Sequence, residues 1–254
     1  RGVCRCDREV GRVSQVVTQD VRDSMPGAMA VGHVRYSTTG KQSRENAQPI
    51  AITHVKGNLA VAHNGNLVNA GALRRRIEMS GGIFRSSNDT EVLVYTIVGE
   101  RLKCGSIEEA VKNAMGVIEG AYSLVVMSPR KLIAARDPHG FRPLCIGLLD
   151  GAYIFASETC ALDALGAQFV RDVEPGEICV VEDGELRSMH CGVQCKSSAC
   201  VFEYIYFARP DSVIDGASVE LARQEAGKYL SIEHPVGADV VIGVPASGIP
   251  AAIG

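Results

Sequence analysis

Residues 59–70 read LAVAHNGNLVNA: a short apolar run reaches the polar group His-Asn-Gly-Asn, and apolar character resumes at Leu67. Asn-Gly is a common signal for a tight turn, so one interpretation is an ordinary hairpin turn. A turn at the end of a buried strand would also expose backbone N–H groups and the Asn64 carboxamide at the rim of a sheet. Such donors can hold the oxygen of a reacting carbonyl. Asn64 and Gly65 are therefore candidates for an oxyanion hole, and the flanking sequence decides between the two interpretations.

The composition is that of a globular protein with a sizeable core. Of the 254 residues, 46% are hydrophobic and 22% are charged, and the net charge is −3. This balance provides no basic surface for nucleic acid. The sequence contains no apolar run of transmembrane length, and its first residues lack the apolar core of a secretory signal. We expect neither a nucleic-acid nor a membrane partner, and the length allows one large domain or one domain with part of another.

The nine cysteines favour a reducing, cytoplasmic environment, because their number is odd and several lie in apolar segments. Cys191, Cys195 and Cys200 follow the pattern CxxxCxxxxC. This spacing matches neither structural zinc knuckles nor the usual ferredoxin run. We expect no complete local metal site, although one of these thiols could ligate a metal whose other ligands lie elsewhere.

Apolar periodicity predicts that strands and helices are both frequent before residue 195. Ser87 or Asn88 would cap a helix that carries Asp89 in its first turn. Turn signals at 128–130 and 150–151 predict two strand hairpins. The expected strands are 28–34, 50–54, 122–127, 131–135, 144–149, 153–157 and 178–182, and the expected helices are 67–79, 88–98, 107–118 and 158–165.

A boundary is expected near residue 195, because the composition between Cys191 and Ala199 becomes small and polar. Beyond it, residues 201–207 are predicted as a strand, 218–230 as a helix and 238–244 as an apolar strand of the parallel type. The last strand leads into Pro245-Ala246-Ser247-Gly248 and a helix, which is the layout of a phosphate-binding loop. Roughly 60 residues cannot bury both faces of a parallel sheet, so this part is interpreted as the beginning of a second domain.

Three polar groups at the ends of predicted elements suggest a single site. Arg35, in the run Arg35-Tyr36-Ser37-Thr38, could clamp a carboxylate, and Asp89 could pair with an ammonium group. Asn64 and neighbouring backbone N–H groups would polarise a carbonyl between them. Together they fit an α-amino acid with a side-chain carbonyl. Taken singly, Arg35 and Asp89 have simpler interpretations as a surface ion and a helix cap, so the prediction depends on their combination.

Eight motifs lie in order along the chain from about Gly11 onward. They are GHVRYSTTG (32–40), LAVAHNGNLVN (59–69), SSNDTEV (86–92), GAYSLVVM (120–127), RDPHGFRPL (136–144), ASETCALD (156–163), VEPGE (173–177) and FEYIYFARPDS (202–212). In this order they resemble the glutamine phosphoribosylpyrophosphate amidotransferase family. HVRYST and HNG are shared with other glutamine amidotransferases of the N-terminal-nucleophile type, whereas EYIYFARPDS and the segment ending in VPASG are more specific.

The resemblance implies an α+β fold, a four-layer αββα glutaminase domain of the N-terminal-nucleophile hydrolase class, over residues 1–195. The start of an α/β type I phosphoribosyltransferase domain would follow over residues 196–254. In this family the first domain hydrolyses glutamine, and the ammonia displaces pyrophosphate from phosphoribosylpyrophosphate in the second, with Mg²⁺ on the leaving group. The product, 5-phosphoribosylamine, is that of the first step of purine synthesis. The implied partners are glutamine and phosphoribosylpyrophosphate, and the implied assembly is a homo-oligomer.

The resemblance also implies roles for individual residues of the first domain. Arg35 would hold the carboxylate of glutamine, Asp89 its amino group, and Asn64 with the Gly65 N–H its developing oxyanion. Tyr36 would line the same pocket.

Two further positions match the second half of the family's pattern. Ser247 and Gly248 match a turn that contacts pyrophosphate, although Ala246 stands where the family usually carries an acidic residue. Cys200 matches a position that ligates a [4Fe–4S] cluster in one branch of the family. Branches without a cluster can also carry cysteine there, so both interpretations of Cys200 stay open.

The family's nucleophile is a cysteine at the mature N-terminus whose α-amino group acts as the base, and it has no counterpart here. The chain begins at Arg1, and GVCRCDR around Cys4 and Cys6 does not resemble the family's Cys-Gly-apolar opening. We interpret the sequence as an internal fragment and expect no glutaminase activity from it alone. Two alternatives stay open: the glutaminase half of another amidotransferase, such as glucosamine 6-phosphate synthase, and a non-catalytic regulatory homologue.

Overall fold

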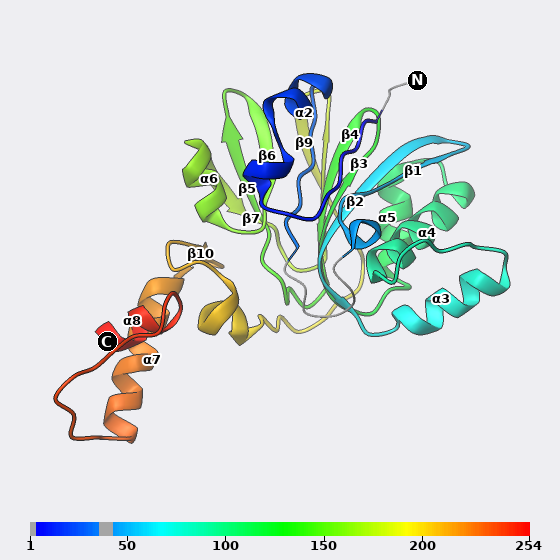
Figure 1. The fold of residues 1–254 in the computed structure, drawn as a ribbon. Coiled ribbons are helices and arrows are strands. Elements are labelled where there is room, and N and C mark those ends of the chain that lie inside the picture. Colours follow the sequence, from blue (N-terminus) through cyan, green and yellow to red (C-terminus); the bar gives the residue numbers. More distant parts are fainter. Residues whose placement is uncertain (1–3, 36–42) are drawn as a thin grey trace.

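The computed structural model describes residues 4–35 and 43–254 (Figure 1). Within these ranges the helices are α1 (Val13–Val16), α2 (Gln19–Ser24), the 3₁₀ helix η1 (Arg44–Asn46), α3 (Ala70–Met79), α4 (Asp89–Lys103), α5 (Ile107–Met115), α6 (Thr159–Leu165), the π-helix η2 (Glu203–Phe207), α7 (Val219–Glu233) and α8 (Gly248–Ile253). The strands are β1 (Ile50–His54), β2 (Gly57–Leu67), β3 (Gly120–Met127), β4 (Lys131–Arg136), β5 (Cys145–Leu149), β6 (Ala152–Ala156), β7 (Gln168–Asp172), β8 (Glu177–Glu182), β9 (Glu185–His190), β10 (Val213–Ile214) and β11 (Ala217–Ser218).

The described strands form two antiparallel sheets and a small hairpin. One sheet has the order β1-β2-β3-β4-β8-β9, the other has the order β6-β5-β7, and β10 pairs with β11. Helices α3, α4 and α5 lie on one side of the six-stranded sheet, the three-stranded sheet lies on its other side, and α6 covers the outside of the smaller sheet (Figure 1). This is the α, β, β, α order of layers that the sequence resemblance implies.

Alternating side chains on the strands produce these layers. On β4, Ile133 belongs to the core under α4 and α5, while its neighbour Ala134 belongs to the core between the two sheets. On β5, Ile146 packs between the sheets and Cys145 packs against Leu162 of α6. Successive residues of a strand point to opposite faces, so each strand can serve two cores. A fully buried side chain such as Ile133 stabilises the fold by about 2 kcal/mol.

Helix α4 begins as the sequence predicts. Asn88 is its N-cap, and Asn88 Oδ1 accepts a hydrogen bond from the Thr90 N–H at 3.0 Å. Asp89 is the first helical residue, where a negative charge is favourable near the positive end of the helix dipole. The cap therefore fixes the residue that the sequence singles out for binding an ammonium group.

Strand β2 passes through Asn64 and Gly65 without turning, so the predicted turn at this position is wrong. The strand pairs with β3 from Ala60 to Leu67 in continuous register. Gly65 has φ +141, and a Cβ atom added to it would lie 1.9 Å from the carbonyl oxygen of Ala121. Glycine is required here because the β3 backbone comes too close for any side chain, and not because the chain reverses.

Three predicted strands, 28–34, 201–207 and 238–244, are also wrong. Residues 28–34 adopt no regular structure, and residues 203–207 form the π-helix η2 instead of a strand. A short apolar run fits a helix as well as a strand, so periodicity alone cannot separate them. Residues 238–244 are irregular and largely exposed, and in the described part of the chain no strand lies beside them to pair with. The remaining predicted strands are present, whereas β7, β9, β10 and β11 are not among the predicted strands.

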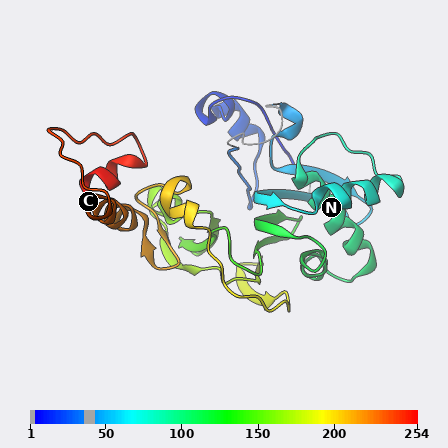
Figure 2. The ribbon, with the colours of Figure 1, turned by 90° about the horizontal axis from the view of Figure 1, so that it is seen from below.

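The C-terminal helices α7 and α8 pack on each other and lie away from the two large sheets (Figures 1 and 2). Their backbones approach so closely that a Cβ atom on Gly227 would lie 1.9 Å from the Ala251 carbonyl oxygen. The connection to the sheets is made by η2 and the β10–β11 hairpin.

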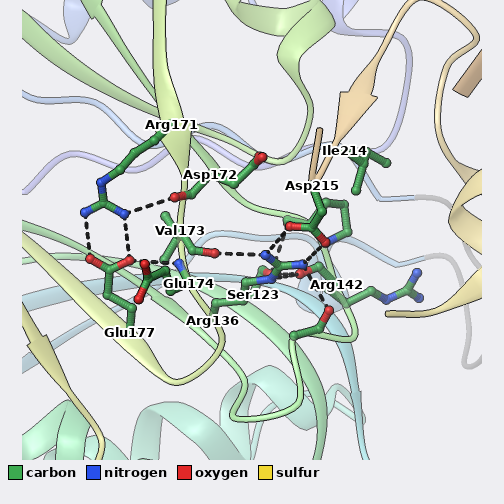
Figure 3. A network of polar contacts seen from close by, with 12 residues as sticks. Ser123, Arg136, Arg142, Arg171, Asp172, Val173, Glu174, Glu177, Ile214 and Asp215 are labelled. Atoms are coloured by element: carbon green, nitrogen blue, oxygen red, sulfur yellow. Dashed lines mark hydrogen bonds and ion pairs between the residues drawn. The ribbon is translucent and has the colours of Figure 1, made fainter. Parts of the chain in front are cut away.

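A buried arginine joins this hairpin to the sheets. Arg136, at the end of β4, is 2% exposed and donates to both carboxylate oxygens of Asp215 at 2.8 Å. Its remaining N–H groups donate to the carbonyl oxygens of Gly140, Arg142 and Val173 at 2.8–3.0 Å. Figure 3 shows the Arg136 guanidinium with Asp215, Val173 and Arg142 around it. A buried charge needs such complete pairing, because an unpaired one would be strongly destabilising.

Candidate functional site

Asn64 lies exposed on β2, and its carboxamide is held from two sides. Oδ1 lies 3.0 Å from His33 Nε2, and Nδ2 donates to Ser157 Oγ at 2.8 Å. Burial lowers the pKa of His33, although its hydrogen bond to Asn64 acts in the opposite direction, so the ring is neutral at pH 7 and donates through Nε2. Among the contacts of the described residues, Ser157 takes one of the two N–H donors of the amide. Within residues 4–35 and 43–254, no contact made by Asn64 takes the second N–H, which could donate to a ligand.

Asp89 faces the end of β2 from the first turn of α4. Its Oδ2 accepts the Leu67 N–H at 3.0 Å, and its Oδ1 lies 3.7 Å from His63 Nδ1. The pKa of His63 is lowered, mainly by burial of its ring, although the Asp89 charge acts in the opposite direction. A neutral His63 does not neutralise Asp89. The carboxylate, with 22% of its side chain exposed, can therefore attract a ligand's ammonium group.

A cavity of about 380 Å³ adjoins Asn64. Arg35, His33 and Gln48 line it together with residues of the 8–17 segment. His33 belongs both to this cavity and to the contacts of Asn64, so the two are neighbours. Arg35 is half-buried in the lining, where a guanidinium can receive a carboxylate. Tyr36, the other predicted pocket residue, lies outside the described residues.

The structure thus brings most of the predicted first-domain site together. Asn64 and Gly65 lie on β2, Asp89 contacts the same strand, and Arg35 lies in the adjoining cavity. A carbonyl placed at Asn64 would meet a neutral N–H donor whose orientation is already fixed. Preorganised donors of this kind stabilise negative charge that develops on a carbonyl oxygen.

The predicted residues of the second half do not join this site. Ser247 and Gly248 begin α8, and the Gly248 N–H donates to the Val244 carbonyl at 2.9 Å. Cys200 is half-buried just before η2, and its N–H donates to the Phe141 carbonyl at 3.3 Å. Over residues 4–35 and 43–254, no three His, Cys, Asp or Glu side chains are grouped as a metal site would need.

Four contacting residues were not identified from the sequence. His33, His63 and Ser157 lie inside motifs that were recognised, but their partners lie 27 to 93 residues away along the chain. Gln48 lies in a polar segment, and its only signal is the proline that follows it directly before β1. Contacts between distant segments leave no local pattern in the sequence.

None of the helices built from the described residues is both long and apolar enough to cross a membrane.

Comparison with known proteins finds relatives of one kind along almost the whole chain. An amidophosphoribosyltransferase of Methanocaldococcus jannaschii is 46% identical over 97% of this chain and 56% of its own length. One from Bacillus subtilis is 45% identical over 96% of this chain and 51% of its own. The chain thus spans about half the length of the curated relatives it matches.

Two solved structures have a similar fold. The glutamine phosphoribosylpyrophosphate (PRPP) amidotransferase from B. subtilis, complexed with ADP and GMP, matches with a TM-score of 0.81 and 46% identity over 87% of this chain and 48% of that one. A structure described as the allosteric regulatory enzyme of purine biosynthesis matches with a TM-score of 0.82 and 47% identity over 87% and 47%.

A family model described as a glutamine amidotransferase domain matches residues 33–164. This range contains Arg35, Asn64, Gly65 and Asp89, the residues that the sequence singled out and the structure brings together. The chain therefore belongs to the glutamine amidotransferase domain family.

Proposed function

We propose that the site around Asn64 is the glutaminase site of an amidophosphoribosyltransferase. The observation that carries the proposal is the fixed Asn64 carboxamide, held by His33 and Ser157 on the same strand whose Leu67 N–H donates to the Asp89 carboxylate. Hydrolysis of a side-chain amide needs such a donor where the tetrahedral intermediate becomes negative. The names of the relatives support this function over the glucosamine 6-phosphate synthase alternative.

In this proposal each polar group of the site binds one part of glutamine. Arg35 holds the α-carboxylate, Asp89 the α-ammonium group, and Asn64 with the Gly65 N–H the oxygen of the side-chain amide. Tyr36 completes the pocket. Water then replaces the amide nitrogen, which gives glutamate and ammonia.

The proposed overall reaction continues with phosphoribosylpyrophosphate. Ammonia attacks the anomeric carbon and displaces pyrophosphate, which yields 5-phosphoribosylamine for purine synthesis. We assign residues 1–195 to the glutaminase domain and 196–254 to the beginning of the transferase domain. Ser247 and the α8 turn that includes Gly248 would contact the pyrophosphate.

The proposal includes two metal groups, Mg²⁺ and a [4Fe–4S] cluster, but assigns at most one ligand to them among the described residues. Mg²⁺ would neutralise charge on the leaving pyrophosphate, but the turn at Ala246 offers no carboxylate to hold it, so we assign it no ligand among the described residues. A [4Fe–4S] cluster takes four thiolates, and the described residues bring no three metal ligands together. Cys200 is therefore proposed as one ligand at most. We also propose that the protein is a homo-oligomer in the cytoplasm.

Loss of the Asn64 carboxamide tests the function. In the complete gene product, Asn64→Ala should lower glutamate release from glutamine about 10²-fold, as expected for removal of an oxyanion donor. Formation of phosphoribosylamine from added ammonia should be unchanged, because ammonia bypasses the glutaminase site. Both rates can be measured on the same preparation.

A control separates the site from a general effect of the substitution. Asn113 is exposed on α5, on the far side of the six-stranded sheet, and Asn113→Ala should retain full turnover. Unchanged turnover of Asn64→Ala would disprove the oxyanion assignment. Absence of glutamate release by the unsubstituted protein would disprove the proposed function itself.

A further inference from the structure

The ladder between β1 and β2 stops shortly before the candidate oxyanion site. Its last pair joins Ile50 to Val61. If the same register continued, Pro49 would lie opposite Ala62 and Gln48 opposite His63. Proline has no N–H to donate, so the backbone ladder cannot simply continue through residue 49.

The side chain of Gln48 takes the place of the missing strand. Gln48 Oε1 accepts the His63 N–H at 2.7 Å, and Gln48 Nε2 donates to the His63 carbonyl at 3.2 Å. In an antiparallel sheet, a hydrogen-bonded pair of residues exchanges the same two bonds through its backbones. The carboxamide therefore supplies the next hydrogen-bonded pair of the ladder, two residues beyond Val61, in the register that the β1–β2 pairs define.

We call the two hydrogen bonds between the Gln48 carboxamide and the His63 backbone the clamp. His63 links the clamp to Asn64 and to Asp89. The residue directly precedes Asn64, and its imidazole Nδ1 lies 3.3 Å from Thr90 Oγ1 and 3.7 Å from Asp89 Oδ1. On its other edge the strand pairs with β3, where His63 lies opposite Leu124. In the part of the chain that the structure describes, no strand pairs with this edge of β2 beyond Val61. Gln48 binds both backbone groups of His63 there, and His33 contacts the neighbouring Asn64 side chain.

We propose that Gln48 is a positioning residue for the glutaminase reaction, because its carboxamide fixes the backbone of β2 at His63 and thereby the place of Asn64 and Gly65. The proposal rests on the proposed function. Gln48 also lines the cavity beside His33 and Arg35, so a role in substrate binding is the rival interpretation. The two roles differ in kinetics: a misplaced oxyanion donor lowers kcat, whereas a lost substrate contact raises KM.

The test uses Gln48→Met in the complete gene product, because methionine has a similar length but has neither the amide oxygen nor the amide nitrogen. Hydrogen exchange of a peptide covering residues 59–67 should be about 10-fold faster than in the unsubstituted protein, since the His63 N–H loses its acceptor. Glutaminase kcat should fall about 10-fold or more, with KM for glutamine changed less than about 3-fold. Gln168→Met, at an exposed position of β7, is the matched control and should change neither measurement.

Unchanged exchange of the 59–67 peptide in Gln48→Met would overturn the clamp. Faster exchange with an unchanged kcat, or with a loss confined to KM, would overturn the positioning role. A lack of glutaminase activity in the unsubstituted protein would instead disprove the proposed function, and the exchange measurement would still decide whether the clamp exists.

Discussion

Glu177 is a buried carboxylate surrounded by hydrogen-bond donors, and its ionised form stabilises the fold (Figure 3). Arg171 donates to both of its oxygens at 2.7 and 2.8 Å, and Ser188 Oγ and the Glu174 N–H donate at 2.6 and 2.8 Å. Burial alone would raise the pKa of Glu177, but these hydrogen bonds outweigh it and lower the pKa from 4.5 to about 2. The ionised group therefore stabilises the fold above pH 4.5, and this stabilisation is lost as the pH falls toward 2.

Glu177→Gln is expected to lower the free energy of unfolding by on the order of 2 kcal/mol at pH 7, because Arg171 loses its charged partner. The difference from the unsubstituted protein should shrink as the pH falls from 4.5 to 2, where Glu177 itself becomes protonated. Urea denaturation over this pH range measures both effects. Glu185→Gln, at an exposed position of β9, should change stability by less than about 0.5 kcal/mol. A difference that did not vary with pH would contradict the ion-pair explanation.

At the scale of secondary structure, the pairing of strands β2 and β3 depends on Gly65. A methyl group there would lie 1.9 Å from the Ala121 carbonyl oxygen, at a φ of +141 that other residues avoid. Gly65→Ala should therefore lower the free energy of unfolding by about 3 kcal/mol and increase hydrogen exchange in β2 and β3. Thermal unfolding with peptide-level exchange measures both.

The matched control is a glycine with open space around it. Gly99 lies inside α4, and a Cβ atom added there meets no other atom within 4 Å. Gly99→Ala should raise the free energy of unfolding by about 0.5–1 kcal/mol, because alanine is the better helix former. If both substitutions had the same sign, backbone crowding at Gly65 would not be the reason for glycine there.

These elements also show how far the sequence determines the structure. The start of α4 was predictable, because the Asn88 cap and Thr90 are two residues apart. The role of Gly65 was not, because Ala121 on β3 lies far along the chain and Asn-Gly is equally typical of a turn. The candidate site was predicted through Arg35, Asn64 and Asp89 because their motifs are local and resemble a known family, whereas partners such as Ser157, 93 residues from Asn64, are set by the fold alone.

Across the whole molecule, polar contacts join the sheets to the segment that carries η2 and β10–β11. They join residues of the 136–159 region to residues of the 203–215 region, and none could be read from local sequence. Three of them join two side chains: Arg136 with Asp215, Arg142 with Glu203, and Glu158 with Ser212. Because the first pair is bidentate and the arginine is buried, it should contribute most to the attachment.

Asp215→Asn tests this attachment, since it keeps the size of the side chain and removes the charge that Arg136 needs. Hydrogen exchange of peptides within residues 203–218 should become about 10-fold faster, and it should increase more there than in the two large sheets, where only the end of β4 carries the Arg136 charge that loses its partner. Asp211→Asn is the control in the same segment: Asp211 pairs with Arg209 at the surface, where both side chains are more than half exposed, so its loss should cost less than about 1 kcal/mol. Equal exchange in the two variants would mean that the segment is held by its other contacts and that the Arg136 pair only satisfies a buried charge.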